Sequence, residues 1–212
     1  MHTCPLCSSL QTNFYFEDKN RSYMQCARCQ LVFVPKQQRL DPIKEKEHYD
    51  HHINNPDDPG YRHFLSRLTI PLLERIELGS HGLDFGCGPG PALAQLLQEV
   101  GHKVDLHDIY YYPNAEYLSK QYDFVTATEV IEHLYDPHQI WKLWLQMVKQ
   151  GGWLGIMTKL VVDLEGFKNW HYKFDPTHVC FYSQATFRYL AQRDKLELEF
   201  IGSDVILLRK LA

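Results

Sequence analysis

The chain has 212 residues, of which 44% are hydrophobic and 23% charged, and its formal net charge is -4 at pH 7. This size and composition predict one globular domain with a small appendage, and they exclude the disordered and membrane-spanning classes. The slight acidic balance gives no general attraction to phosphate backbones, which disfavours nucleic acid as a partner. Because the chain has neither a basic, apolar leader nor a run of about 18 apolar residues, we expect a cytoplasmic protein without membrane contact.

The N-terminal head, residues 1–35, carries four of the six cysteines. Cys4 and Cys7 form one Cys-x2-Cys pair, Cys26 and Cys29 form a second, and 18 residues separate the pairs. In a chain without an export signal this spacing predicts a zinc ribbon with one tetrahedral, structural zinc ion. A polar turn between the pairs is expected to fold back as a hairpin and to bring them together. Two disulfides or a metal-free remnant are the alternatives.

Residues 36–79 are expected to connect the head to the body, first as a polar loop and then, from about Tyr61, as an amphipathic helix. His48, His51 and His52 in the loop are interpreted as a solvated face, with a lid over a bound cofactor as the alternative. Tyr61 is counted among the candidate cofactor-binding residues.

From residue 80 onward, helical and extended patterns alternate, which indicates an α/β fold with a mostly parallel, Rossmann-like sheet. The last two strands flank a Gly-Ser-Asp turn and are expected to form an antiparallel hairpin. A double glycine at 151–152 is expected to end the second helix of the body. The predicted strands are 82–85, 104–107, 124–128, 153–157 and two within 196–210, and the predicted helices are 91–100, 137–148 and 184–190.

The turn after the first body strand, residues 84–90, reads DFGCGPG. Closely spaced glycines between a strand and a helix let the backbone approach a ligand, so this turn predicts a nucleotide-like ligand. The dinucleotide pattern G-x-G-x-x-G would require glycine where Pro91 stands, which disfavours a pyrophosphate. Asp108 ends the second strand, where a carboxylate can accept hydrogen bonds from both ribose hydroxyls.

Three further segments accompany Asp108: LDFGCGPG at 83–90, YDFVTATEVIEHLYDP at 122–137 and KQGGWLGIMT at 149–158. In combination they resemble the class I S-adenosylmethionine-dependent methyltransferases, in the broad branch that includes the quinone-biosynthesis methylases. The resemblance covers about Leu83 to the C-terminus. It implies a methyltransferase that uses S-adenosylmethionine and acts on a small-molecule acceptor.

The resemblance also implies roles for single residues. Asp84, Gly86 and Gly88 would contact the methionine portion, Asp108 would hold the ribose, and Thr128 and Glu129 would lie beneath the sulfonium. The full set of cofactor-binding candidates is Asp84, Gly86, Cys87, Gly88, Gly90, Asp108, Ile109, Thr128, Glu129 and Tyr61.

The sequence departs from the family pattern after Asp108, because only 14 residues, 109–122, precede Asp123. The family normally places a helix and a further strand there. We therefore expect the helix to be lost or vestigial. The adjacent aromatic residues Tyr110, Tyr111 and Tyr112 are expected to supply a wall on which adenine stacks.

An acceptor oxygen, nitrogen or acidic carbon that carries a proton needs a base, and histidine suits this role near neutral pH. His133, His171 and His178 are the candidates, with His133 first because of its position in the motif. His171, Asp175 and His178 would alternatively resemble a two-histidine, one-carboxylate iron site. An acceptor-site lid is the favoured interpretation of that loop.

Trp170, Tyr172 and Tyr182 are expected to offer apolar and stacking walls to a planar or sugar-like acceptor. Two other classes of function stay open. The ribbon would recognise RNA in an RNA methyltransferase, although the head has too slight a basic excess for a phosphate-binding patch. A non-catalytic binding module that retains the fold is the third class.

Overall fold

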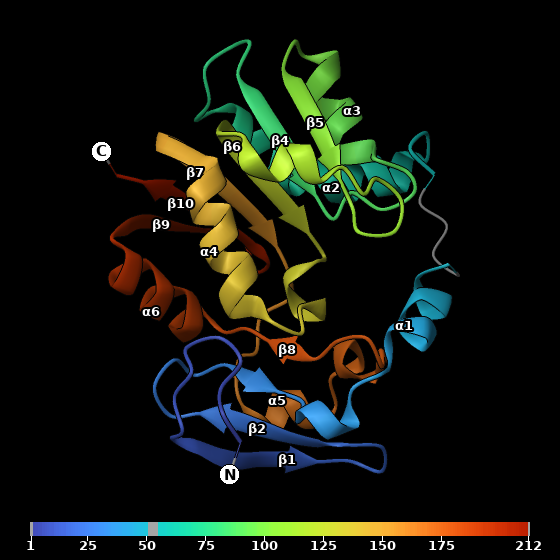
Figure 1. The fold of residues 1–212 in the computed structure, drawn as a ribbon, viewed down its shortest axis with the longest axis vertical. Helices are drawn as coiled ribbons and strands as arrows, with labels where there is room; N and C mark the ends of the chain where they lie inside the picture. Colours follow the sequence, from blue (N-terminus) through green and yellow to red (C-terminus); the bar gives the residue numbers. More distant parts are fainter. Residues whose placement is uncertain (1, 51–54, 212) are drawn as a thin grey trace.

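The structure is a computed structural model that describes residues 2–50 and 55–211, so His51 and His52 of the expected histidine cluster lie outside the described residues. Two sheets organise the chain (Figure 1), a larger one of six strands and a smaller one of four. The strands are β1 (Thr12–Glu17), β2 (Ser22–Cys26), β3 (Val32–Phe33), β4 (His81–Phe85), β5 (Lys103–His107), β6 (Tyr122–Thr128), β7 (Val148–Met157), β8 (Cys180–Phe181), β9 (Leu196–Ile201) and β10 (Val205–Lys210). The helices are α1 (Pro42–Tyr49), α2 (Pro59–Leu73), α3 (Ala92–Glu99), α4 (Pro137–Met147), α5 (Leu164–Lys168) and α6 (Gln184–Asp194).

The larger sheet has the strand order β5-β4-β6-β7-β10-β9. Its first four strands are mutually parallel, and β10 runs antiparallel to both β7 and β9. The predicted parallel sheet with a C-terminal antiparallel hairpin is therefore confirmed. Because β4, β5 and β6 are parallel, their carboxyl ends lie at one edge, where Phe85 is in register with His107 and Asp84 with Thr126.

Helices cover both faces of this sheet. On β10, Val205 and Leu207 belong to the apolar cluster with α2 and α3, whereas Ile206 and Leu208 belong to the cluster with α4 and α6. This alternation follows from the two-residue period of a strand. Figure 1 shows α4 across one face of the sheet. Among the described residues, no helix is long and apolar enough to cross a membrane.

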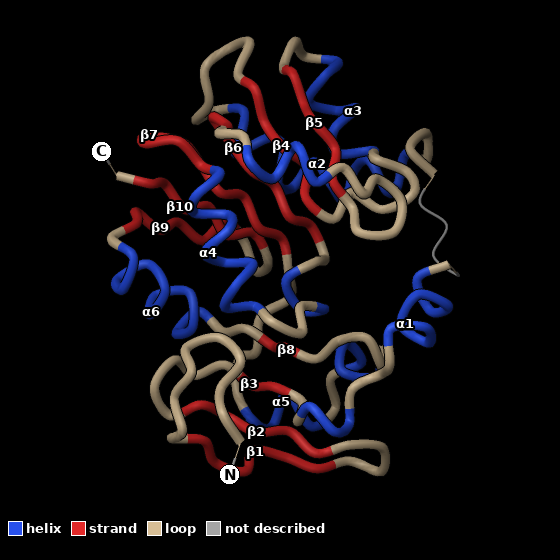
Figure 2. The backbone as a smooth tube through the Cα atoms, in the orientation of Figure 1, coloured by secondary structure: helices blue, strands red, loops and turns tan. Residues whose placement is uncertain are grey.

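The smaller sheet has the order β1-β2-β3-β8 and is antiparallel throughout. Three of its strands come from the cysteine-bearing head, and the predicted hairpin between the cysteine pairs is β1–β2. The fourth strand, β8, comes from the segment before α6. Figure 2 shows the two sheets as separate groups of strands, with the smaller one at the bottom. One apolar cluster runs from the head to the larger sheet and includes Leu31, Phe181 and Phe187.

Two local expectations were wrong. Residues 42–49 form α1 rather than loop, because the Asp41 carboxylate caps the helix by accepting from the amides of Ile43 and Lys44. Helix α4 ends at Met147, and the double glycine lies inside β7, where the pairing with β6 changes register. A Cβ at Gly152 would lie 2.7 Å from the Asp123 carbonyl oxygen, so this close approach of two strands requires glycine there.

The connection from β5 to β6 is as short as the sequence predicts. It contains one 3-10 turn, η2 (Ala115–Ser119), and β5 consequently forms an edge of the larger sheet. The residues at the carboxyl end of β5 and the start of this connection, 107–111, line the candidate site described next.

Candidate functional site

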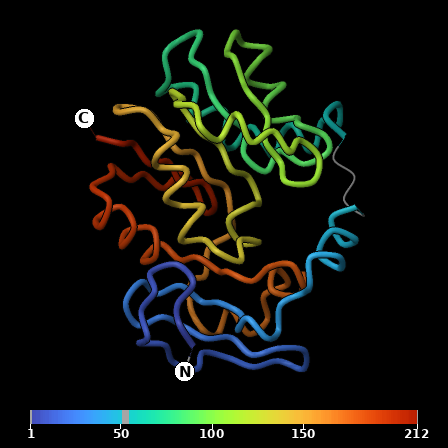
Figure 3. The backbone as a smooth tube through the Cα atoms, viewed as in Figure 1, coloured from blue at the N-terminus to red at the C-terminus, as the bar shows by residue number. Residues whose placement is uncertain are grey.

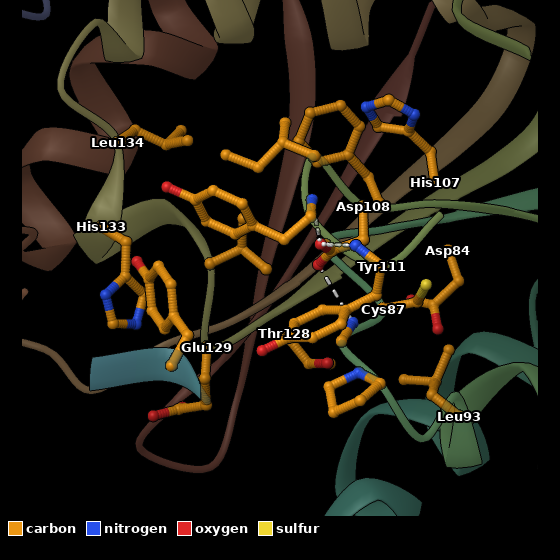
Figure 4. A pocket seen from close by; sticks show the side chains of 18 of the residues that line it. Asp84, Cys87, Leu93, His107, Asp108, Tyr111, Thr128, Glu129, His133 and Leu134 are labelled. Carbon is orange, nitrogen blue, oxygen red and sulfur yellow. Dashed lines mark hydrogen bonds between the residues drawn. The ribbon is translucent and has the colours of Figure 1, made fainter. Parts of the chain in front are cut away.

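A cavity of about 700 Å³ opens at the carboxyl edge of the larger sheet. Strand ends and their following turns form one side, α1 and α2 cover another, and the segment 172–178 completes it. Figure 4 shows Asp84, Cys87 and Asp108 together, with His133 and Glu129 on the other side of the view.

The glycine turn after β4 brings backbone close to this cavity. Gly86 and Gly88 have φ angles of 73° and 63°, in the left-handed region that glycine adopts without strain. A Cβ at Gly86 would lie 2.5 Å from Cγ2 of Val130, so no other residue fits without movement. The turn therefore offers bare backbone to a ligand, as the sequence predicts.

The Asp108 carboxylate ties this turn to the end of β5. Its Oδ2 accepts from the Gly88 amide at 3.1 Å, and its Oδ1 accepts from the amides of Tyr110 and Tyr111 at 2.8 and 3.1 Å. These bonds appear as dashed lines in Figure 4. A carboxylate offers about four acceptor positions. The backbone thus fixes the group and leaves a position on Oδ2 that faces the cavity.

The cavity has far more acidic than basic side chains. Among the described residues, six carboxylates line it but only one lysine, Lys159, and no arginine. Asp84 is buried, accepts a hydrogen bond from the Thr126 hydroxyl at 3.0 Å, and forms no ion pair with a described lysine or arginine. Burial, helped by the charge of Asp108, raises its pKa to about 7. A cationic ligand fits such a site, because it would supply the missing opposite charge.

The buried carboxylate of Glu132 and the half-buried carboxylate of Glu129 meet at the hydroxyl of Tyr172. This hydroxyl hydrogen-bonds to Glu132 and, at 3.2 Å, to Glu129, and the Thr158 hydroxyl donates to Glu132 at 3.0 Å. Burial raises the pKa of Glu129 to about 7, and burial together with the Glu129 charge raises that of Glu132 to about 8. Since Tyr172 has one hydroxyl proton for two carboxyl groups, it can donate to only one of them at a time, and a proton on the other carboxyl would complete the second hydrogen bond.

Glu129 also has an unusual backbone conformation and a buried oxygen without a hydrogen bond among the described residues. Its φ is 52°, which is uncommon for a residue with a Cβ, and it follows directly after β6. Its Oε1 is buried without a hydrogen-bond partner among the described residues. A buried acceptor that borders the cavity is another feature that a bound ligand would satisfy.

Two histidines lie next to this acidic group. The rings of His133 and His178 are 4.6 Å apart, and both line the cavity. Nδ1 of His178 lies 2.6 Å from the Tyr172 carbonyl oxygen, which can only accept, so the neutral ring carries its proton on Nδ1 and Nε2 is the acceptor atom. Asp175 lies 3.9 Å from that Nε2. Burial opposes ionisation of Asp175, but hydrogen bonds from Thr177 and the charges of His178 and His48 lower its pKa to about 2.

The same corner has the composition of a metal site. Ligand atoms of Glu132, His133 and His178 all lie within 4.8 Å of one another. This set differs from the iron site considered from the sequence, because His171 points elsewhere. The arrangement can therefore exchange protons or hold a cation.

Most of the predicted residues lie together, and several do not. His171 is exposed, with Nε2 3.0 Å from the Lys159 ammonium, and it does not line the cavity. Trp170 borders a different cleft, and Tyr182 is fully buried in the core, so neither is a wall of this cavity. Tyr112 pairs back with Asp108 and also faces away. The candidates that line the cavity are Tyr61, Asp84, Gly86, Cys87, Gly88, Asp108, Ile109, Thr128, Glu129, His133 and His178, whereas Gly90 does not.

Sequence reasoning missed the residues that α1 contributes. Glu45 accepts a hydrogen bond from the Tyr110 hydroxyl at 3.2 Å, and the Tyr49 ring lies 5.3 Å from the His133 ring. The capping residue Asp41 followed by Pro42 was the available signal for this helix. Glu132 was also missed, although its position next to His133 in an apolar stretch could have marked it.

The four head cysteines form a separate cluster. Their sulfur atoms all lie within 4.8 Å of one another, and the pairs Cys4–Cys29 and Cys7–Cys26 have Sγ atoms 3.5 Å apart. These distances are far longer than the ~2.05 Å of a disulfide. They approach the edge of about 3.8 Å that a tetrahedron with Zn–S bonds of ~2.3 Å would have.

Solved methyltransferase structures share this fold. The 1,6-didemethyltoxoflavin N1-methyltransferase of Burkholderia thailandensis, solved with S-adenosylhomocysteine, matches 94% of this chain and 100% of its own with a TM-score of 0.59 and 11% identity. A methyltransferase from Archaeoglobus fulgidus matches 70% of this chain and 94% of its own with a TM-score of 0.54 and 18% identity. The fold is that of the class I S-adenosylmethionine-dependent methyltransferases.

Sequence comparison adds the family. The model of the methyltransferase domain family matches residues 49–199, and the chain belongs to this family. Ubiquinone biosynthesis O-methyltransferases are similar over part of their length. The enzyme of Pseudomonas savastanoi is 42% identical over a match that covers 34% of this chain and 31% of the relative. The enzyme of Pseudomonas putida is 40% identical over a match that covers 42% of this chain and 50% of the relative. The match thus spans a third to a half of these relatives.

The buried carboxylates predict how stability depends on pH. Because folding raises the pKa of Asp84 and Glu132 to about 7 and about 8, the folded state holds protons that the unfolded state releases, and stability falls as pH rises toward 8. Chemical denaturation of the ligand-free protein between pH 6 and 8 measures this fall in the free energy of unfolding. The fall should be less steep in Asp84→Asn and in Glu132→Gln, and each substitution should reduce the slope by up to about 1.4 kcal/mol per pH unit. Glu165→Gln, at an exposed carboxylate, is the control and should match the wild type. Equal slopes in all four proteins would contradict the ionisation behaviour described here.

Proposed function

We propose that this protein transfers the methyl group of S-adenosylmethionine to the hydroxyl group of a small, planar phenolic molecule. The observation that carries the proposal is the cavity at the glycine turn, where six carboxylates face a single lysine. S-adenosylmethionine bears a sulfonium and an ammonium group, so its charge complements this surface. The same charge would repel an RNA phosphate backbone, which favours the small-molecule acceptor over RNA.

Each residue at the turn would contact a different part of S-adenosylmethionine. Asp84 would accept from the ammonium group, Asp108 would accept a ribose hydroxyl through Oδ2, and the Gly86–Gly88 backbone would lie along the methionine portion. Tyr110 and Tyr111 are suited to stack on adenine, in place of the lost helix and strand. Thr128 and Glu129 would form the floor, with Cys87, Ile109 and Tyr61 as further contacts. When bound, S-adenosylmethionine supplies a methyl group already activated by the sulfonium.

The protein's own contribution is to orient the acceptor, to exclude water and to take a proton. His178 is suited to take the hydroxyl proton on Nε2, since the Tyr172 carbonyl holds its Nδ1–H and Asp175 would stabilise the imidazolium. His133, against its ring, would orient the hydroxyl or share this role. The rings of Tyr49, Tyr135 and Tyr172 line this part of the cavity and favour a planar molecule.

The names of the similar ubiquinone biosynthesis O-methyltransferases support oxygen as the acceptor atom. We retain the division into a zinc ribbon at 1–35, a connecting lid at 36–79 and a methyltransferase domain at 80–212. The cavity-facing Glu45, Tyr49 and Tyr61 support a covering role for the lid segment.

We also propose one structural zinc ion at Cys4, Cys7, Cys26 and Cys29. The compact cluster of sulfur atoms supports tetrahedral thiolate coordination with no open position. Such an ion would hold together a head that is too small to fold by apolar burial alone.

Calorimetric titration with S-adenosylhomocysteine tests the donor site. Asp108→Asn keeps an oxygen for the amides of Tyr110 and Tyr111 but loses the charge, so we expect affinity to fall by about 1–3 kcal/mol. Glu116→Gln, exposed in the same connection, should bind like the wild type. Unchanged affinity in a folded Asp108→Asn protein would remove Asp108 from the site.

Turnover on phenolic acceptors tests the base. With a panel of catechols and quinols, His178→Ala should lower turnover by about 10²–10⁴-fold, the usual range for loss of a general base. His171→Ala is a matched control from the same segment and should stay within about twofold, because an exposed side chain outside the cavity contributes little. Intact turnover in both His178→Ala and His133→Ala would contradict the assignment.

Metal analysis under reducing conditions tests the zinc site. Wild-type protein should contain one zinc ion per chain, and Cys29→Ala should lose it because three thiolates remain. Cys180→Ala should retain the metal, since Cys180 lies outside the cluster. A wild-type protein that is folded and free of zinc would refute the proposal.

A further inference from the structure

The head meets the cavity-lining segment 172–178 through one buried arginine. Arg21, at the turn between β1 and β2, is 8% exposed. Its guanidinium donates to the carbonyl oxygens of Lys173, Asp175 and Pro176 at 2.6, 2.8 and 3.1 Å, and its Nε donates to the Tyr23 hydroxyl at 3.0 Å. A single planar cation thus holds three backbone carbonyls of the short segment 173–176, which lies more than 150 positions further along the chain.

A second, ionic contact reinforces the first. The Lys173 side chain is 2% exposed, and its ammonium lies 3.1 Å from Oδ2 of Asp18. The Tyr23 hydroxyl donates to the same oxygen at 3.0 Å. Because a buried lysine without a partner is strongly disfavoured, this pair requires the β1–β2 turn to stay beside the segment. Figure 3 shows the blue N-terminal chain and part of the orange chain together at the bottom of the view.

The opposite side of the same segment faces the cavity. Tyr172 bridges Glu129 and Glu132, and Asp175 and His178 line the cavity. The head therefore holds the backbone of the same segment whose side chains Tyr172, Asp175 and His178 line the cavity. A shift of the Lys173–Pro176 backbone would move both the Tyr172 hydroxyl and the carbonyl that sets the His178 ring.

The head also fixes the chain just after His178. The amide of Val34 donates to the Val179 carbonyl at 2.9 Å, and β3 pairs with β8 through Val32 and Phe181. On its other side, the Val179 amide donates to the Glu132 carbonyl at 2.9 Å. The four cysteines lie at the ends of these head elements, with Cys26 closing β2 and Cys29 preceding β3.

We propose that the four-cysteine head is the positioning scaffold of the acceptor side, with Arg21 as the positioning residue that holds Tyr172 and His178 in place. This inference rests on the proposed methyl transfer. The proposed donor side is built by strand ends of the larger sheet, and among the described residues no hydrogen bond joins Asp84, Gly88 or Asp108 to the head. Loss of the head contact should therefore disable turnover while leaving donor binding intact.

Hydrogen–deuterium exchange of the full chain tests the contact without any acceptor. In Arg21→Ala, exchange across 171–178 should rise by roughly tenfold or more because its backbone restraints are removed, while β4 and β6 keep wild-type protection. Arg28→Ala is the matched control, since Arg28 is an exposed arginine of the same head that contacts Tyr189 instead. Unchanged exchange at 171–178 in Arg21→Ala, or an equal rise in Arg28→Ala, would overturn the inference.

Turnover tests the consequence on the same variants. Arg21→Ala should lose about tenfold to hundredfold in kcat, the scale of a displaced catalytic group, while S-adenosylhomocysteine affinity stays within about twofold. Added guanidinium ion, at non-denaturing concentration, should restore part of the rate. If Arg21→Ala does not fold, Asp18→Asn removes the charge that pairs with Lys173 while Arg21 stays in place, and it should give the same pattern. If Arg21→Ala showed increased exchange but the kcat of the wild type, the positioning role would be overturned. If the wild-type protein turned over none of the acceptors, the proposed function would be contradicted, but the exchange result would still test the contact.

Discussion

The site depends on carboxylates that are buried or half-buried at the carboxyl edge of a parallel sheet and that form no ion pair with a lysine or arginine of the described residues. Asp84, Glu129 and Glu132 all have raised pKa values, because the fold removes them from water before any ligand arrives. Such burial costs stability, so a chain that retains it in one cavity gains something else from it. A donor that carries a sulfonium and an ammonium group beside a single carboxylate would offset this cost on binding. The glycine turn and the Asp108 carboxylate would then determine where the donor's uncharged parts lie.

The two sides of the cavity have different origins. Strand ends of the larger sheet carry the glycine turn, Asp108 and Glu129, and their positions follow from β-sheet register. The proposed acceptor side is the segment 172–178, which lies between the two sheets and is held by hydrogen bonds to both. Tyr172 connects that loop to the end of β6, and Arg21 connects it to the head. A head that shares β8 with the rest of the chain is therefore part of the architecture of the cavity rather than a separate module attached to it.

Features that depend on local sequence patterns could be predicted, whereas side-chain directions that depend on packing between distant segments could not. Periodicity and the glycine turn predicted the strands, the donor edge and the shortened connection after Asp108, and cysteine spacing predicted the head hairpin. Side-chain directions in the irregular segment 158–179 follow from packing between two sheets, so sequence reasoning grouped His171 with His178, although only His178 faces the cavity. The same reason hid β8, which has two residues and no pattern of its own. Helix α1 was missed because its mostly polar residues give no apolar stripe.

We expect this edge of the sheet to bind S-adenosylmethionine rather than a dinucleotide. Calorimetric titration of the wild-type protein with S-adenosylhomocysteine and, separately, with NAD tests it most directly. S-adenosylhomocysteine should saturate one site per chain, whereas NAD should give no heat of binding, because its pyrophosphate would meet carboxylates where it needs cations. Binding of NAD, or no binding of S-adenosylhomocysteine to a folded, zinc-replete protein, would contradict it.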